Sequence, residues 1–165
     1  MTWHFLFFIL LLLTFNSCRQ HNNLTVDKKN EIIMEIKEMM TNYYDDIKTG
    51  GLLAEFKYLD SSNDFSWIPP GYSTGISYDS VANILKANSG GFKSVVNRWY
   101  SLEILPITEN LVTYSGRINS RVIDTSGKIT NTDLLESGTI IKRKDGWKLL
   151  KGRTTFLPQK NESEK

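Results

Sequence analysis

The feature that most constrains the fold is a change of hydrophobic period partway along this 165-residue chain. Between Asp27 and Thr49, apolar residues recur at steps of three and four, which predicts an amphipathic helix. From Ser94 onward, apolar and polar residues alternate in long runs, which predicts strands with one buried face. Helices followed by a series of long strands are typical of the α+β class. We therefore expect a single domain at residues 27–157, with N-terminal helices packed against a curved antiparallel β-sheet.

Segments rich in glycine, proline and asparagine divide the domain into further elements. Because long strands twist and usually bend, the sheet should wrap round the first helix and form a cone with one open mouth. The strand that begins at Ile129 carries apolar residues at both parities, so its outer face is a candidate surface for a homodimer. The expected elements are helices at 27–49, 52–59 and from 77 or 78, and strands at 65–68, 94–105, 111–123, 129–142 and 147–156.

An apolar leader ends at the only cysteine of the chain. The run from Phe5 to Leu13 is too short to cross a bilayer core, which needs ~20 helical residues, but it suits a signal peptide. The segment that follows resembles a bacterial lipobox, with Phe15 three residues before Cys18 and the small residue Ser17 directly before it. By this resemblance, residues 1–17 are a cleaved signal peptide and Cys18 is the lipidated first residue of the mature protein.

Lipidation of Cys18 would fix the protein to the cell envelope, because each buried methylene of an acyl chain contributes about 0.8 kcal/mol. Residues 18–26 would then be a polar tether, and residues 158–165 are expected to be a disordered tail. The expected location is the periplasmic face of the envelope, with the outer membrane as the favoured membrane. The alternatives are an ordinary signal peptide that leaves a free thiol, and a retained membrane anchor.

The composition excludes several kinds of active site. Both histidines, His4 and His21, lie in or beside the leader, so the body of the chain has none. This excludes Ser-His-Asp and Cys-His nucleophiles and histidine-bearing metal sites there. One cysteine permits no intramolecular disulfide and no thiolate zinc cluster. The net charge of +2, without a basic stripe, argues against nucleic-acid binding. We expect no metal and no cofactor.

Four short stretches of the domain occur in an order that is found in one superfamily. They are the helix end Tyr43 to Gly51, the short helix Leu52 to Tyr58, the loop Ile68 to Gly71 and the hairpin Lys144 to Leu149. In this order they resemble the nuclear transport factor 2-like superfamily, also called SnoaL-like or ketosteroid-isomerase-like, a cone-shaped, cystatin-like α+β fold. Its members include isomerases, cyclases, dehydratases and non-catalytic binding domains, so the resemblance implies a fold and leaves the function open.

The ketosteroid-isomerase branch of this superfamily suggests three candidate catalytic residues. That chemistry needs a tyrosine and an acid that stabilise an oxyanion, and a carboxylate base that moves the proton. Tyr43 matches the tyrosine by its distance from the glycines that end the helix, and Glu136 or Ser137 falls near the acid position. The base position falls near Trp67–Ile68, where no carboxylate occurs, although Asp64 lies nearby in a different strand phase.

Each candidate also has a structural interpretation, which we favour. Tyr43 can be a core tyrosine with a satisfied hydroxyl, and Glu136 can face solvent opposite Arg117 or Arg121. We therefore expect a lipid-anchored envelope protein whose non-catalytic cone binds a small apolar molecule or a partner protein. The alternatives are a lyase or isomerase that acts on a small apolar substrate, and a structural dimerisation module. The expected ligand-binding residues are Tyr43, Trp67, Tyr72, Trp99 and Tyr114.

Overall fold

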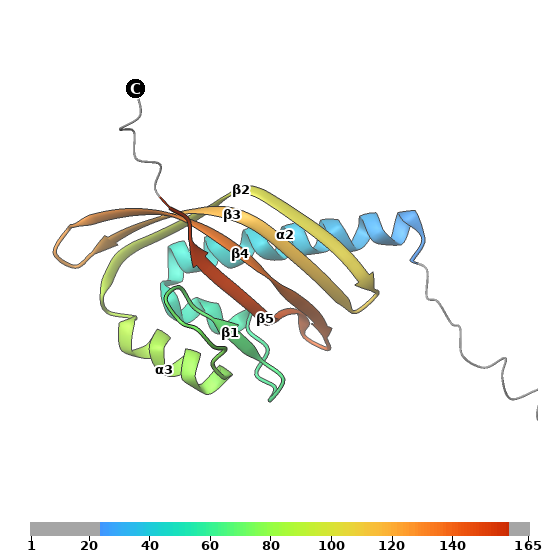
Figure 1. Ribbon diagram of the computed structural model, residues 1–165, viewed down its shortest axis with the longest axis horizontal. Helices are drawn as coiled ribbons and strands as arrows, with labels where there is room; N and C mark the ends of the chain where they lie inside the picture. The colour runs from blue at the N-terminus through green and yellow to red at the C-terminus, as the bar shows by residue number, and fades with distance from the viewer. Residues whose placement is uncertain (1–23, 159–165) are drawn as a thin grey trace, which may run out of the picture.

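A long helix lies against one face of a curved sheet in the computed structural model, which describes residues 24–158 (Figure 1). Its α+β class, with helices first and long strands after them, is the one predicted from the sequence. The predicted signal peptide, the lipidated Cys18 and nearly all of the tether and tail lie outside the described residues. The elements are α2 (Val26–Gly50), the 3-10 helix η2 (Leu52–Lys57), β1 (Ser66–Ile68), α3 (Tyr78–Asn88), β2 (Phe92–Thr108), β3 (Leu111–Asp124), β4 (Ile129–Arg143) and β5 (Gly146–Phe156).

Helix α2 is delimited by the residues that cap it. The Thr25 hydroxyl accepts a hydrogen bond from the backbone N–H of Lys28 at 3.2 Å, which satisfies one free donor of the first turn. At the other end Gly51 has φ +74°, a left-handed conformation that favours glycine, and its N–H donates to the carbonyl of Ile47 at 2.8 Å. One face of the helix is buried against the sheet, through Ile32, Ile36, Met39, Met40, Tyr43, Tyr44 and Ile47.

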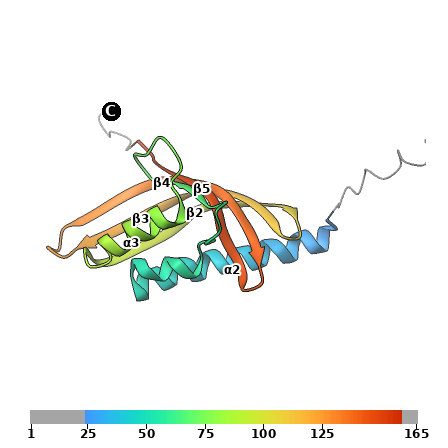
Figure 2. The same ribbon diagram turned by 90° about the horizontal axis from the view of Figure 1, so that it is seen from below.

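The five strands form one sheet in the order β1-β5-β4-β3-β2, and the four long strands are antiparallel as predicted. The short β1 differs, because it pairs with β5 in parallel. The chain approaches β5 in this direction before β1 begins: Leu59 bridges Leu149 in parallel, and the Asp60 N–H donates to the Leu149 carbonyl at 2.9 Å. Helix α3 then carries the chain from β1 to the opposite edge of the sheet, where β2 lies (Figure 2).

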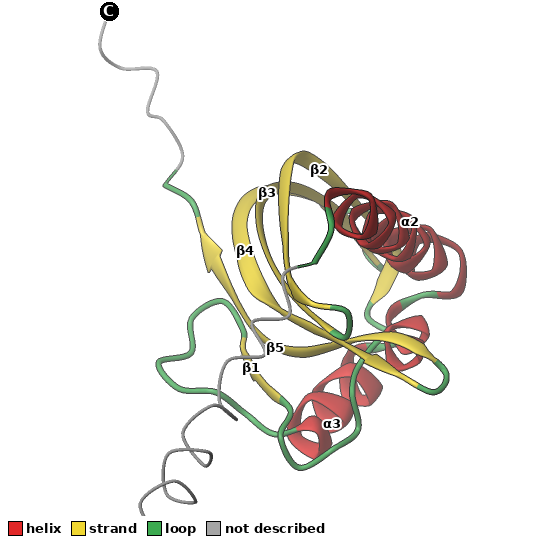
Figure 3. Ribbon diagram, turned by 90° about the vertical axis from the view of Figure 1, so that its right-hand side faces the viewer, coloured by secondary structure: helices red, strands yellow, loops and turns green. Residues whose placement is uncertain are grey.

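The sheet curves round α2, as the end-on view shows (Figure 3). Irregular pairing accompanies the curvature. The register of β2 against β3 shifts near Ser94, Trp99 and Pro106, and β4 against β5 shifts at Thr139. The result is an open cone rather than a closed barrel, and its interior is the space between α2 and the inner face of the sheet.

Glycines on the inner face provide room for aromatic rings. A Cβ atom on Gly116 would come within 2.7 Å of the Trp99 ring, and one on Gly138 would lie 3.0 Å from the Tyr114 ring. On β5, a Cβ atom on Gly152 would lie 2.3 Å from the Trp67 ring. Three aromatic rings therefore pack directly against the backbone of glycine residues.

Candidate functional site

The inner face of the sheet holds a buried carboxyl group. The register places Glu136 of β4 between Gly116 of β3 and Thr154 of β5, and the residue is only 7% exposed. Its two carboxyl oxygens accept hydrogen bonds from the Tyr114 hydroxyl at 2.9 Å and the Thr154 hydroxyl at 3.3 Å. The favoured interpretation, that Glu136 faces solvent opposite Arg117 or Arg121, is therefore wrong, because Glu136 is buried and these arginines pair with Leu135 and Asn131.

A second carboxyl group, which the sequence analysis missed, enters the interior from η2. The Tyr43 hydroxyl donates to the carboxyl of Glu55 at 2.9 Å. Glu55 is half-buried, and its carboxyl group accepts this hydrogen bond from a tyrosine that is buried. Tyr43 is thus a buried tyrosine with a satisfied hydroxyl, as its structural interpretation predicted, although its partner is an acid. The only sequence signal for Glu55 is that it is a single acid in the otherwise apolar stretch LLAEF.

Both interior carboxyl groups are poised to gain or lose a proton near neutral pH. Burial raises the pKa of Glu55 to about 7, against the opposing effect of the hydrogen bond from Tyr43. Burial likewise raises the pKa of Glu136 to about 7; the hydrogen bonds from Tyr114 and Thr154 oppose this rise, and the charge of Glu55 adds to it. The charge of Glu55 thus affects the pKa of Glu136. With a pKa near neutral pH, each of the two side chains is suited to act as acid or base.

Aromatic rings connect these two acid–tyrosine pairs. The ring centroids of Tyr43 and Tyr44 lie 5.1 Å apart, those of Tyr44 and Trp99 lie 5.5 Å apart, and those of Trp99 and Tyr114 lie 6.2 Å apart. Three buried polar atoms in the described chain have no hydrogen-bond partner there: the Tyr44 hydroxyl, the Trp99 Nε1 and the Asn97 Oδ1. Buried polar groups are normally paired, so these three atoms are exceptions among residues 24–158.

The other candidate residues lie elsewhere. Asp64 is exposed in the turn before β1, where its N–H donates to the Ser62 hydroxyl at 3.3 Å. Tyr72 is 49% exposed on the loop that follows β1. Trp67 is partly buried at the edge of the sheet, against Gly152. The structure therefore brings together Tyr43, Trp99, Tyr114 and Glu136, but leaves Asp64 and Tyr72 outside this group.

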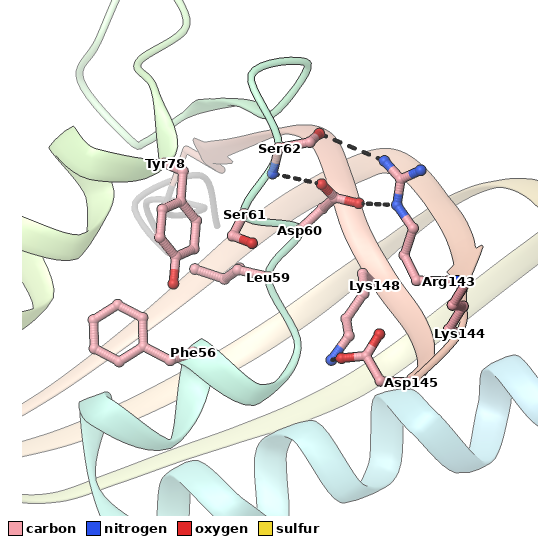
Figure 4. A pocket seen from close by; sticks show the side chains of 10 residues that line it. All are labelled: Phe56, Leu59, Asp60, Ser61, Ser62, Tyr78, Arg143, Lys144, Asp145 and Lys148. Atoms are coloured by element: carbon pink, nitrogen blue, oxygen red, sulfur yellow. Dashed lines mark hydrogen bonds and ion pairs between the residues drawn. The ribbon is translucent and has the colours of Figure 1, made fainter.

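A hollow of about 460 Å³ on the outside of the cone contrasts with the interior (Figure 4). Its two acids are both paired with cations: Asp60 accepts a hydrogen bond from Arg143, and the carboxyl group of Asp145 lies 2.9 Å from the Lys148 ammonium group.

Nearby, the carboxyl group of Glu35 of α2 accepts hydrogen bonds from Lys142 at 2.8 Å and from the Trp147 Nε1 at 2.6 Å. We call Glu35, Asp60, Lys142, Arg143 and Trp147 the hairpin latch, since they fasten the β4–β5 hairpin to α2 and to the turn before β1.

Two further searches of residues 24–158 were negative. No group of three or more histidine, cysteine, aspartate or glutamate residues in that range is arranged to hold a metal ion. No helix within the same range combines the length and the apolar character that a membrane span requires.

Solved structures with very different sequences share this architecture. A nuclear transport factor 2-like superfamily protein from Salmonella enterica superposes with a TM-score of 0.66 at 17% identity, over 82% of this chain and 98% of that one. The fold is that of the nuclear transport factor 2-like superfamily. The nuclear transport factor 2-like fold was the one expected from the order of the sequence elements.

Two enzymes or proposed enzymes have the same nuclear transport factor 2-like fold. A proposed scytalone dehydratase from Novosphingobium aromaticivorans has a TM-score of 0.70 at 12% identity, over 81% of this chain and 89% of that one. A hexachlorocyclohexane dehydrochlorinase has a TM-score of 0.65 at 8% identity, over 81% and 90% of the two chains. No family model and no curated protein matches the sequence. At these identities the likeness establishes the fold alone.

Proposed function

We propose that this protein binds a small molecule inside the cone, between α2, η2 and the inner face of the sheet. The observation that carries the proposal is the set of three buried polar atoms without partners, on Tyr44, Asn97 and Trp99. Leaving such groups unpaired costs about 1–3 kcal/mol each, so a partner that fills the space is favoured. Aromatic walls with a few convergent polar groups are also typical of small-molecule sites. The expected ligand is therefore a small, largely apolar molecule that carries a few polar atoms.

Native mass spectrometry of the purified mature protein, released from a mild detergent, tests this proposal. We expect a co-purified small molecule, and we expect the occupied fraction to fall in the variant Tyr44→Phe. The matched control is Tyr100→Phe, because Tyr100 is an exposed tyrosine on the same sheet. A wild-type protein that carries no small molecule, and that gains none from an extract of its own cells, would contradict the proposal.

A second candidate function is proton transfer, as in a lyase or isomerase. The specific observation in its favour is that Glu55 and Glu136 both have a pKa of about 7. In this role the Glu55 carboxylate would take a proton from carbon, and protonated Glu136, held in place by the hydrogen bond from Tyr114, would donate a hydrogen bond to the oxygen that gains charge. Glu55 would thus supply the base that the segment near Trp67 lacks. If Glu55→Gln left a demonstrated turnover unchanged, this role would be excluded.

The proposal includes a lipid anchor at Cys18. It is supported by the apolar run from Phe5 to Leu13, by Phe15 and Ser17 ahead of Cys18, and by the mainly polar residues that separate Cys18 from the start of α2. The cone would then face the periplasm from its membrane, with the outer membrane favoured. Mass spectrometry of the mature N-terminus should find an acylated Cys18, whereas an unmodified and uncleaved Cys18 would refute the anchor.

Self-association through the outer face of the sheet is a further part of the proposal. Leu105 and Leu135 are 59% and 44% exposed there. Between them lie the cross-strand pairs Thr113–Thr139 and Ser115–Ser137, whose small side chains leave the surface flat enough for another sheet. We expect a homodimer in analytical ultracentrifugation and a monomer for Leu135→Lys, with Lys37→Glu on the exposed side of α2 as a control that changes charge away from the outer face of the sheet.

A further inference from the structure

The hollow outside the cone lies between η2, the turn before β1, α3 and the β4–β5 hairpin (Figure 4). Its volume of about 460 Å³ falls within the range of roughly 300–1,000 Å³ that is usual for small-molecule sites. The turn that borders it is hydrogen-bonded to the sheet: the Asp60 N–H donates to the Leu149 carbonyl at 2.9 Å, and the Leu149 N–H donates to the Tyr58 carbonyl at 2.7 Å. The hollow is therefore a fixed feature of the fold, and its lining residues differ from those of the two acid–tyrosine pairs inside the cone.

One end of this hollow is formed by the rings of Phe56 of η2 and Tyr78 of α3, which we call the aromatic ledge. Their centroids lie 6.3 Å apart with an interplanar angle of 56°. The buried Phe65 packs edge-to-face against Tyr78, with 5.9 Å between centroids, and holds that ring in place. Phe56 and Tyr78 are only half-buried, so part of each ring is open to a ligand. A flat apolar group is the partner that such rings favour.

The other end of the hollow is cationic. Arg143, Lys144 and Lys148 line it together with two acids, Asp60 and Asp145. Each acid is already paired, Asp60 with Arg143 and Asp145 with Lys148. Lys144 is exposed and has no ion-pair partner within residues 24–158, so the hollow keeps one positive charge in excess. A group with a single negative charge complements this excess.

Hydrogen bonding also favours an acceptor at the cationic end. Both carboxyl oxygens of Asp60 are occupied, one by the Ser62 N–H at 2.8 Å and the other by Arg143. The Lys148 ammonium group has three donors, and it uses two of them, for its paired carboxylate and for the Lys57 carbonyl at 2.6 Å. The guanidinium group of Arg143 has five donors, of which Asp60 takes one. A carboxylate, which only accepts, fits these donors, whereas an ammonium group would face donors and a positive charge.

We propose that this hollow is a second binding site, for a small aromatic acid that carries a single negative charge. The ring of the ligand lies on the aromatic ledge, and its carboxylate lies beside Lys144 and the remaining donors of Arg143 and Lys148. Figure 4 shows the ledge and the cationic side chains on opposite sides of the hollow, which is the arrangement that such a ligand needs. The inference does not depend on binding inside the cone, because the residues, the charge and the ligand are different.

Three probes separate the contribution of the ring from that of the charge: 2-naphthoate, 2-naphthol and acetate. Equilibrium dialysis of the mature protein in phosphatidylcholine nanodiscs measures their binding, and empty nanodiscs give the background. We expect the affinity for 2-naphthoate to fall as NaCl rises from about 0.05 to 0.5 M, because salt screens the charge, and the affinity for 2-naphthol to stay constant. Acetate, which has no ring, should bind at least about tenfold more weakly than 2-naphthoate.

A charge variant tests the cationic end. Lys144→Glu reverses the excess charge and should weaken the binding of 2-naphthoate about tenfold, whereas 2-naphthol should bind as before. The variant should fold normally, because Lys144 is exposed. The matched control is Lys128→Glu, which changes the net charge equally. Lys128 is also exposed, but it precedes β4 whereas Lys144 follows it, so the two lysines lie at opposite ends of that strand.

A ring variant tests the aromatic ledge. Phe56→Leu removes one ring and should weaken the binding of 2-naphthoate about fivefold. Phe92→Leu is the matched control, since Phe92 is a partly exposed ring on β2. It should leave the affinity for 2-naphthoate unchanged.

The outcomes decide this inference separately from the proposed function. If 2-naphthoate does not bind, or binds as tightly to Lys144→Glu or to Phe56→Leu as to the wild type, the second site is refuted. Binding inside the cone is then untouched, because it is tested by the co-purified molecule and by Tyr44→Phe. Tyr44→Phe should leave the affinity for 2-naphthoate unchanged. A loss in Tyr44→Phe without a loss in Lys144→Glu would place the probe inside the cone and would also refute the second site.

Discussion

Carboxyl groups occur in two regions of this molecule, and they are treated in opposite ways. Inside the cone, Glu55 and Glu136 are hydrogen-bonded to hydroxyl groups, and burial raises the pKa of each to about 7. In the hairpin latch, Lys142 and Trp147 lower the pKa of Glu35. Burial alone would raise the pKa of Asp60, but Arg143 and Ser62 outweigh it and lower the pKa. The latch acids, which hold elements together, thus form ion pairs with cationic side chains, whereas the interior acids accept hydrogen bonds from tyrosines.

This difference indicates which acids serve the fold and which are free to serve a ligand. A buried acid without a cation is costly to ionise, so it contributes little to stability at neutral pH. Such groups cluster at functional sites, because a proton that is easily moved is useful there. The latch acids keep their charge at neutral pH, and their ion pairs hold the β4–β5 hairpin against α2 and the turn before β1. The predictions below test this division of labour.

The largest effect should be on how the free energy of unfolding depends on pH: the interior acids and the latch acids should change it in opposite directions. For Glu136 the pKa of about 7 in the folded state exceeds its ordinary value of 4.5, so the folded protein binds more protons between these values. The stabilisation is fully present below pH 4.5 and is lost as the pH rises through 7. One pKa unit corresponds to about 1.4 kcal/mol, so the loss is at most roughly 3 kcal/mol.

Urea denaturation of wild-type protein and of Glu136→Gln at a series of pH values checks this effect. The difference between the two free energies of unfolding should change across pH 4.5 to 7, with the variant gaining stability relative to wild type as the pH rises. Glu103→Gln, on the exposed outer face, should show no such change. A difference that stays constant with pH would mean that Glu136 is not a buried acid in solution.

The next largest effect should come from the buried acid of the latch. The Asp60 side chain is only 3% exposed and accepts hydrogen bonds from Arg143 and from the Ser62 N–H. Asp60→Asn removes the charge and should lower the free energy of unfolding by about 2 kcal/mol at pH 7. The stabilising effect of Asp60 is present above its ordinary pKa of 3.8 and is lost as the pH falls below it, since its pKa is lowered on folding.

Asp145→Asn is the control for this prediction in urea denaturation. Asp145 lines the same hollow and pairs with Lys148, but its side chain is 71% exposed, so solvent screens the pair and its loss should cost far less than the loss of Asp60. Equal losses for the two variants would show that burial of Asp60 does not decide its contribution.

A smaller effect should follow from Tyr114→Phe. This variant removes the hydrogen bond that stabilises the charged form of Glu136, so the pKa of Glu136 should rise further above 7. The free energy of unfolding should fall by about 1 kcal/mol. Carbon-detected NMR of the carboxyl groups measures the pKa directly, and Tyr100→Phe on the exposed strand edge serves as the control. A pKa that falls in Tyr114→Phe would contradict the assigned donor.

The smallest effect should come from Glu35→Gln, which keeps an acceptor for the Trp147 N–H but removes the charge paired with Lys142. Because both side chains of the ion pair are about one-third exposed, solvent screens it, and the loss should be about 0.5 kcal/mol. Urea denaturation measures this loss, and Glu38→Gln, one turn away on the exposed side of α2, should be neutral in the same assay. A loss above that for Asp60→Asn would reverse the ranking.

Much of the fold could be predicted because the spacing of apolar residues differs between the helices and the strands. Apolar residues that recur with the helical period in α2 and alternate in β3, such as Ile36, Val112 and Ile118, are buried as that spacing predicts. Local signals also set the turns, including the one at Gly127. The parallel pairing of β1 could not be predicted, because it depends on where the chain lies beside β5, and no residue of a three-residue strand encodes that.

The site was harder to predict than the fold. Strand β4 has apolar residues at both parities, so its sequence does not reveal which face Glu136 occupies; the register against Gly116 decides it. The contact between Tyr43 and Glu55 joins residues twelve positions apart on two different helices, so no periodic pattern reports it. The single inner-face glycines beside Trp99 and Tyr114 were the one available hint, since a glycine within a strand often marks a close approach.

The irregular pairing of β2 has a consequence beyond the shape of the cone. β2 is seventeen residues long and forms a free margin of the sheet, which would ordinarily be a template for strands of other molecules. Its shifts of register and Pro106, which has no N–H to offer, break that margin into short pieces. The bends that form the interior of the cone therefore also protect this edge of the sheet against pairing with the strands of other chains.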